Sequence, residues 1–181
     1  MNSGVMAVEI KGVFYQALKN VFPNVVDVLD PELGKHFEGD TDPDAWYPAE
    51  PYAKAVEYLV AHISPEAITF LGNEFVEIMK ERFGVLGIST TADVAEKSPR
   101  LYHEFIKAPE REGWELEEYR PGRLVIRETS FLPYVDFISG VIKRALEAAG
   151  ALNVRVAVLS DRARGDEVNR YLAEWLEPEK D

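Results

Sequence analysis

The residues that could do chemistry in this chain are few, and their spacing argues against most kinds of active site. Three histidines and no cysteine are present, which excludes disulfides, thiolate metal sites and cysteine nucleophiles. The acidic run Asp40-Thr41-Asp42-Pro43-Asp44 matches the first half of a calcium loop. An EF-hand loop, however, needs glycine at its sixth position and glutamate at its twelfth, where this chain has Ala45 and Pro51. We interpret the run as a solvated acidic loop.

Motifs for nucleophilic catalysis and for phosphate binding are also missing. Ser130 and His103 could be combined with an aspartate on paper, but no Gly-x-Ser-x-Gly turn supports a triad. No Gly-x-Gly-x-x-Gly or P-loop pattern occurs, and Ser139-Gly140 belongs to an amphipathic helix rather than to a phosphate loop. We therefore expect a protein that is not an enzyme.

The three histidines have ordinary interpretations. His36 and His62 lie in polar or helix-terminal surroundings, which predicts surface positions. His103 lies near an apolar face between Leu101-Tyr102 and Phe105-Ile106, which predicts a hydrogen-bonded, partly buried side chain. Metal ligation by His103 is the alternative.

The elements that position these residues fall into two parts. After the Pro109 to Gly113 boundary, the patterns predict β-β-α-β-β: Trp114 to Tyr119, Leu124 to Thr129, a helix from Pro133 to Gly150, Val154 to Leu159 and Val168 to Trp175. Residues 10 to 107 are predicted to be mostly helical. The sequence thus predicts an α+β fold in a single domain over residues 1–181, with a helical lobe (1–109) packed with an antiparallel sheet lobe (110–181).

Apolar spacing and caps define the helices of the first part. The patterns predict helices from Ile10 to Val21, over residues 50 to 63, and from Ser64-Pro65 to Gly84. A second Ser-Pro pair, Ser98-Pro99, predicts the start of the helix that carries His103.

Composition limits the partners and the location. The formal net charge of −12 disfavours binding to nucleic acid and to anionic lipid. No stretch approaches the roughly 20 apolar residues of a membrane span, and the first residues lack the plan of a signal peptide. We expect a cytoplasmic protein.

Several motifs, taken in order, resemble one family. Ile10-Lys11-Gly12-Val13 before an amphipathic helix, then Val25-Val26-Asp27, is similar to the opening of heme nitric-oxide/oxygen-binding (H-NOX) domains. The run from Asp136 to Ile142, followed by Gly150 and a valine-rich strand, resembles their last helix and strand. The likeness covers nearly the whole chain and extends to heme-free relatives, the 4-vinyl-reductase-like domains and the myxobacterial sensor proteins.

This sequence departs from the family at both anchors of the heme. The resemblance places Pro99 where the iron-ligating histidine should be, with His103 one turn later. It places Glu128, Ser130 and Leu132 at the Tyr, Ser and Arg positions that hold the heme propionates. A glutamate would repel propionates, so we expect no cofactor. The alternative is a heme-based gas sensor that uses His103.

The resemblance also implies a pocket between the helices and the sheet. We take Phe14, Phe75, His103, Phe105 and Tyr134 as candidate lining residues for a small apolar or aromatic ligand, although aromatic residues at this spacing can equally fill a solid core. The predicted function is a small-molecule sensor or ligand-binding regulatory module. Because we expect no attached output domain, a signal would pass to a partner protein or through a homodimer. The other alternative is a structural or assembly protein without a ligand.

Overall fold

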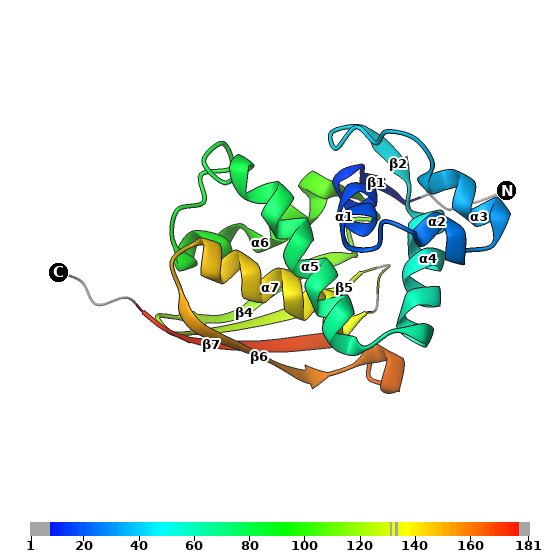
Figure 1. Cartoon of the computed structure of the whole chain (residues 1–181). Coiled ribbons are helices and arrows are strands. Elements are labelled where there is room, and N and C mark those ends of the chain that lie inside the picture. Colours follow the sequence, from blue (N-terminus) through cyan, green and yellow to red (C-terminus); the bar gives the residue numbers. More distant parts are fainter. Residues whose placement is uncertain (1–7, 131, 133, 178–181) are drawn as a thin grey trace, which may run out of the picture.

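Helices cover one face of a four-stranded antiparallel sheet, as Figure 1 shows. The computed structural model describes residues 8–130, 132 and 134–177. The sheet has the order β4-β5-β7-β6, made of Gly113–Arg120, Arg123–Thr129, Asn169–Leu176 and Leu152–Ser160. Helix α7 (Val135–Ala148) connects β5 to β6. These elements confirm the predicted β-β-α-β-β order, although the predicted helix start at Pro133 lies outside the described residues.

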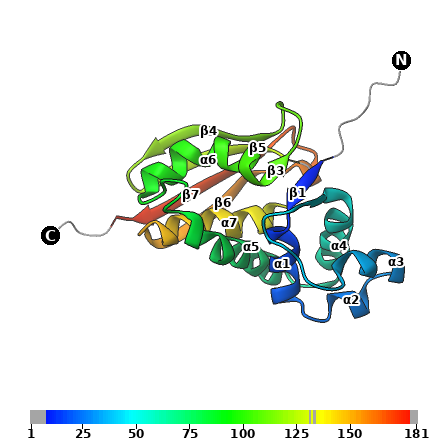
Figure 2. The same cartoon turned by 90° about the horizontal axis from the view of Figure 1, so that it is seen from above.

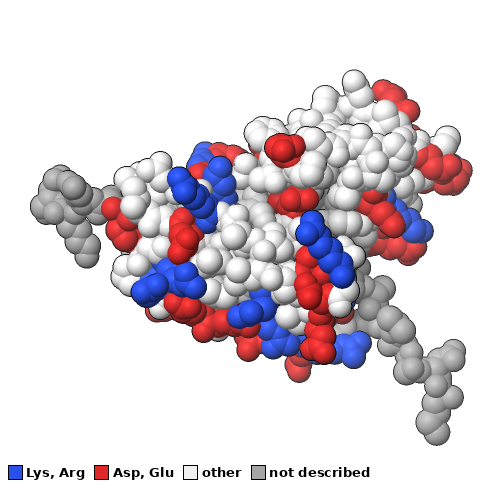
Figure 3. Space-filling view, turned by 90° about the horizontal axis from the view of Figure 1, so that it is seen from below, with Lys and Arg blue, Asp and Glu red and all other residues white. Residues whose placement is uncertain are grey.

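Alternation along the strands separates an inner face of the sheet from an outer one. On β5, Leu124, Ile126 and Glu128 are buried beneath the helices. The outer face carries ion pairs such as Arg127 to Glu115 and Arg170 to Glu117. Figure 3 shows this face from below, with acidic and basic side chains interspersed. The inner face is therefore the one that can form a core or a site.

Helix α5 (Pro65–Met79) crosses α7 at two glycines that permit an unusually close approach. A Cβ atom on Gly72 would lie 2.1 Å from the carbonyl oxygen of Phe137, and one on Gly140 would lie 2.1 Å from that of Thr69. No larger residue fits either position without moving the helix backbones. The crossing fixes α5 and α7 as one layer, in which α7 packs on strands β6 and β7 of the larger sheet.

The N-terminal part combines helices with a second, smaller sheet, visible in Figure 2. Its helices are α1 to α4, spanning Val13–Val21, Val25–Val28, Pro31–Gly34 and Ala49–His62. The small sheet has the order β2-β1-β3, made of Trp46–Pro48, Glu9–Lys11 and Ile106–Lys107. Single 3-10 turns occupy Lys35–Phe37, Lys80–Arg82 and Arg162–Arg164. The sequence patterns missed this sheet because its strands have only two or three residues each.

Helix α6 (Thr91–Phe105) begins seven residues before the predicted start at Ser98-Pro99, so that prediction is wrong. Thr90 and Asp93 form a capping box at the true start. Pro99 lies inside the helix and lacks the N–H that would bond Ala95. The Ser98 hydroxyl replaces it, donating to the Ala95 carbonyl oxygen at 2.9 Å. A neighbouring side chain thus satisfies the acceptor that the proline leaves free.

The α+β class and the antiparallel sheet agree with the prediction from sequence. All strands of the larger sheet follow Pro109 in the chain. Within the described residues, no helix combines the length and apolar character needed to cross a bilayer.

Candidate ligand-binding site

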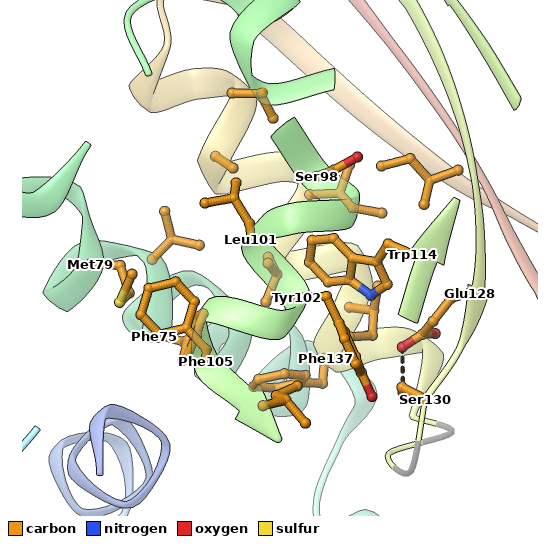
Figure 4. Close-up of a pocket in the computed structure, with 18 of the residues that line it drawn as sticks. Phe75, Met79, Ser98, Leu101, Tyr102, Phe105, Trp114, Glu128, Ser130 and Phe137 are labelled. Atoms are coloured by element: carbon orange, nitrogen blue, oxygen red, sulfur yellow. Dashed lines mark hydrogen bonds between the residues drawn. The ribbon is translucent and has the colours of Figure 1, made fainter. Parts of the chain in front are cut away.

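A cavity of about 80 Å³ lies between α5, α6, α7 and the inner face of β5 (Figure 4). Its wall is apolar on nearly every side. The lining side chains are Phe14, Phe75, Val76, Met79, Phe83, Leu86, Val94, Ser98, Leu101, Tyr102, Phe105, Ile106, Trp114, Leu124, Ile126, Glu128, Ser130, Leu132, Phe137, Ile138, Val141, Ile142 and Ala145. The volume is several times the roughly 10–15 Å³ that one water molecule requires.

Helical periodicity decides which residues of α6 reach the cavity. Ser98, Leu101, Tyr102 and Phe105 lie at positions i, i+3, i+4 and i+7, which form one stripe of a helix. Period-two alternation does the same for β5, where every second residue from Leu124 to Glu128 faces inward. Helices thus supply most of the apolar wall, and the sheet supplies an acidic group, Glu128.

Aromatic contacts hold the apolar end of the cavity. The rings of Phe14 and Phe75 lie 4.5 Å apart between centroids, and Phe75 meets Phe105 edge-on at 6.1 Å. Phe75 also meets Phe137 of α7 at 6.1 Å. Such contacts restrict the rings to few orientations, so the wall is largely preformed.

Glu128 is the one acidic side chain among the described residues of the cavity wall, and it is completely buried. Its Oε2 accepts hydrogen bonds from Tyr171 Oη at 2.8 Å and from Asn169 Nδ2 at 3.0 Å. Its Oε1 lies 2.5 Å from Ser130 Oγ (Figure 4). Burial and the neighbouring Glu128 raise the pKa of Tyr171, which keeps that phenol a donor.

Hydrogen-bond geometry favours a neutral Glu128. The Ser130 hydroxyl has one proton but two acceptors, Glu128 Oε1 and the Leu132 carbonyl oxygen at 2.9 Å, while its oxygen also accepts from Leu132 N–H. A carboxylic acid satisfies every contact, because Glu128 then donates to Ser130 and Ser130 donates to Leu132. Burial raises the pKa of Glu128, and the contacts with Ser130, Asn169 and Tyr171, together with the nearby indole of Trp114, oppose this rise only in part. The pKa of the Glu128 carboxyl therefore lies above its ordinary value, and the group stays protonated at pH values where an exposed glutamate is ionised.

Trp114 on β4 places its indole N–H beside this carboxyl (Figure 4). The nitrogen is buried, and among the described residues it has no acceptor at hydrogen-bonding geometry. It is nevertheless close enough to Glu128 to lower the pKa of the carboxyl. The polar end of the cavity thus has donor capacity that the protein does not fully use.

The structure brings three of the five predicted lining residues together and places two elsewhere. Phe14, Phe75 and Phe105 line the cavity. His103 is solvent-exposed, because it follows Tyr102 and so points about 100° away around α6. Tyr134 is half-buried, and its hydroxyl reaches the Ala53 carbonyl oxygen on α4 at 3.4 Å. Burial raises the pKa of Tyr134 to about 12.

Neither comparison by sequence finds a match, whereas comparison of structures finds many. No protein-family model matches the chain, and no curated protein matches it by sequence. A Cs H-NOX mutant with an unnatural amino acid superimposes with a TM-score of 0.67 at 12% identity, covering 95% of this chain and 100% of its own. An H-NOX protein from S. oneidensis in the Fe(II)NO state gives 0.65 at 11%, covering 93% and 100%. An oxygen-binding H-NOX domain related to soluble guanylate cyclases gives 0.63 at 11%, covering 94% and 97%.

This chain has an H-NOX-like fold. The residues of its cavity do not fit a heme. No histidine, lysine or arginine is among the described lining residues, and Met79 and Tyr102 are the only ones of types that ligate heme iron. The buried acid Glu128 would face propionates without a compensating cation. The cavity is also smaller than the roughly 150 Å³ that admits benzene in an engineered protein.

The sequence patterns do not indicate the polar end of the cavity in this H-NOX-like fold. The sequence marks Glu128 and Ser130 only as departures from a motif, and its patterns do not indicate Asn169, Tyr171 and Trp114 as site residues. A signal did exist, since Glu128 continues the inward alternation of Leu124 and Ile126. No group of three or more potential metal ligands occurs within the described residues.

Proposed function

We propose that this protein is a small-molecule sensor or ligand-binding regulatory module that works without heme and without catalysis. The observation that carries the proposal is the apolar cavity between the helices and the sheet, which has a single polar end. Ligand sites of this kind are concave and mostly apolar, with a few polar groups that set orientation. The similar structures include an H-NOX protein in the Fe(II)NO ligation state and an oxygen-binding H-NOX domain, which supports a ligand-binding role for this fold.

Several observations favour the heme-free proposal over a gas sensor that uses His103. The imidazole is exposed on the side of α6 that faces away from the cavity. Moving it inward would require α6 to rotate by about 100°, which would carry buried Tyr102 and Phe105 out of the core.

The same geometry supports a route for a signal. The cavity is bounded by α6 on one side and by the α5–α7 layer on another. If a ligand binds more tightly when α6 and the α5–α7 layer lie slightly farther apart, it shifts the population toward that wider state. We propose that a separate partner protein or a homodimer contact reads this shift.

The test of ligand binding is a thermal-shift screen of small apolar and aromatic compounds on the full chain. A ligand specific to the folded state stabilises it by about 2.7 kcal/mol at one hundred times Kd. Phe105→Leu should enlarge the cavity and change which compounds bind. Phe70→Leu is the matched control, because Phe70 lies on α5 but is 55% exposed. A flat screen for both variants and for the wild type would favour the structural-protein alternative.

The test of the heme-free state is an absorption spectrum after expression with ample heme. We expect no Soret band near one heme per chain. A stoichiometric band that His103→Ala abolishes would establish the gas-sensor alternative instead.

A further inference from the structure

One end of the cavity is acidic, and the charges around it indicate which head group a ligand carries. We propose that the cavity binds a small apolar amine, with its alkyl body among the phenylalanines and its ammonium group against Glu128. This inference rests on the proposed ligand-binding function and specifies the chemical class of the ligand.

The charge balance of the wall favours a cation. Glu128 is fully buried, and no ion pair to it occurs within the described part of the chain. An ionised carboxyl in such surroundings is strongly disfavoured unless a cation pairs with it. A ligand with a carboxylate or phosphate head would instead bring a negative charge into a space where no described lining residue is a cation to pair with it.

The walls beside Glu128 suit an ammonium group as well. Trp114 and Tyr102 line the cavity near its polar end (Figure 4). Aromatic faces attract ammonium groups, most strongly where water is excluded. A carboxylate with aromatic neighbours therefore offers an ammonium two kinds of stabilisation in one place.

The groups around Glu128 leave its charge uncompensated. Trp114 from β4 and Ser130, Asn169 and Tyr171 on the other sides are all neutral. The guanidinium of Arg162 bonds the Ser130 carbonyl oxygen at 2.9 Å rather than the carboxyl. A second acid on this side, Asp161, is ion-paired with Arg164, and its charge raises the pKa of Tyr171.

Binding of the amine then releases one proton. Without ligand, the carboxyl of Glu128 is protonated and donates to Ser130. In the complex the carboxyl O–H bond breaks, its proton leaves to solvent, and the carboxylate accepts from the ammonium N–H. The Ser130 hydroxyl then rotates, so that it donates to the Glu128 carboxylate instead of to the Leu132 carbonyl oxygen. Affinity for the ammonium therefore rises with pH, by up to tenfold per unit, for as long as free Glu128 is protonated.

The experiment compares three ligands that share a three-carbon chain: propylamine, propan-1-ol and propanoate. Each has fewer non-hydrogen atoms than benzene, which needs a cavity of roughly 150 Å³, so each suits the smaller cavity of about 80 Å³. The readout is the indole N–H resonance of Trp114 during titration of the full chain, assigned with Trp114→Phe. We expect the amine to bind at least tenfold more tightly than the alcohol, and the acid to bind more weakly than either.

Two variants separate the head group from the cavity. Glu128→Gln should remove the preference for the amine while keeping the affinity for the alcohol. Glu115→Gln is the matched control, because Glu115 pairs with Arg127 on the outer face of the sheet. It should leave all three affinities within twofold.

A measurement on the wild type keeps the inference testable if Glu128→Gln fails to fold. Calorimetry of amine binding in two buffers of different ionisation enthalpy should show release of close to one proton. Equal affinity for amine and alcohol, no proton release, or a preference that survives Glu128→Gln would overturn the inference. Alcohol binding under those outcomes would leave the proposed function standing, whereas no binding by any ligand would remove both.

Discussion

Replacing Glu128 with glutamine should make the protein less sensitive to rising pH. The amide has the shape of the protonated carboxyl, so its oxygen can accept from Asn169 and Tyr171 while its NH₂ donates to Ser130. It differs in having no proton to lose. At acidic pH the two proteins should differ in free energy of unfolding by no more than about one hydrogen bond, roughly 1 kcal/mol.

The magnitude follows from linkage. Burial raises the pKa of Glu128 in the folded state above its ordinary value of 4.5. Between those two pKa values the folded state binds more protons than the unfolded state. Wild-type stability therefore falls as pH rises through that window, by about 1.4 kcal/mol per pH unit for the one group. Above the raised pKa the loss is complete and the slope disappears.

The assay is urea unfolding of both proteins from pH 5 to pH 8, read as a difference so that all other titrating groups cancel. The free energy of unfolding of Glu128→Gln should rise relative to that of the wild type with each step up in pH, until the two curves of stability against pH run parallel. Parallel curves over the entire range would mean that Glu128 titrates as an ordinary surface acid, which would refute the account of the polar end. Glu115→Gln should run parallel to the wild type throughout.

Three further predictions concern the scaffold. Ile142→Ala removes a core side chain that is 3% exposed, and should cost about 2–5 kcal/mol in urea unfolding; Asp42→Asn in the exposed acidic loop should stay within about 0.5 kcal/mol. Gly140→Ala drives a methyl group against the Thr69 carbonyl oxygen and should lower the free energy of unfolding by about 1–3 kcal/mol. Gly84→Ala, which has open space around it, should not destabilise the protein. Equal effects of the two substitutions would disprove the close helix crossing. Thr90→Ala should cost about 0.5–2 kcal/mol and increase amide hydrogen exchange in the first turn of α6.

The sequence predicted the larger sheet well because its strands are long and its signals are local. The alternation of Tyr171, Ala173 and Trp175 and the Pro121-Gly122 turn specify β7 and the β4–β5 hairpin, with Gly122 at a φ of +81°. The small sheet could not be predicted in this way, since its strands pair residues as distant as Glu9 and Lys107. Its strands are too short for a periodic signal.

The sequence indicates residues at the apolar end of the cavity but not those at its polar end. Phe75 and Phe105 follow from helical periodicity. His103 was misplaced because the patterns did not settle the rotation of α6, whose start was assigned to Ser98-Pro99 rather than to the Thr90 cap. The Glu128 network depends on β5 pairing with β7, which joins residues more than 40 positions apart. Only the fold brings those groups together.

The most direct test of the central claim is a crystal structure of the protein under xenon pressure. Xenon enters apolar cavities that stay dry and that a ligand can reach. We expect a xenon atom among Phe75, Phe105 and Phe137, and its loss when Val141→Phe fills the space. A crystal that takes up no xenon there, with the cavity closed by repacked side chains, would contradict the claim that this fold carries a ligand-binding site.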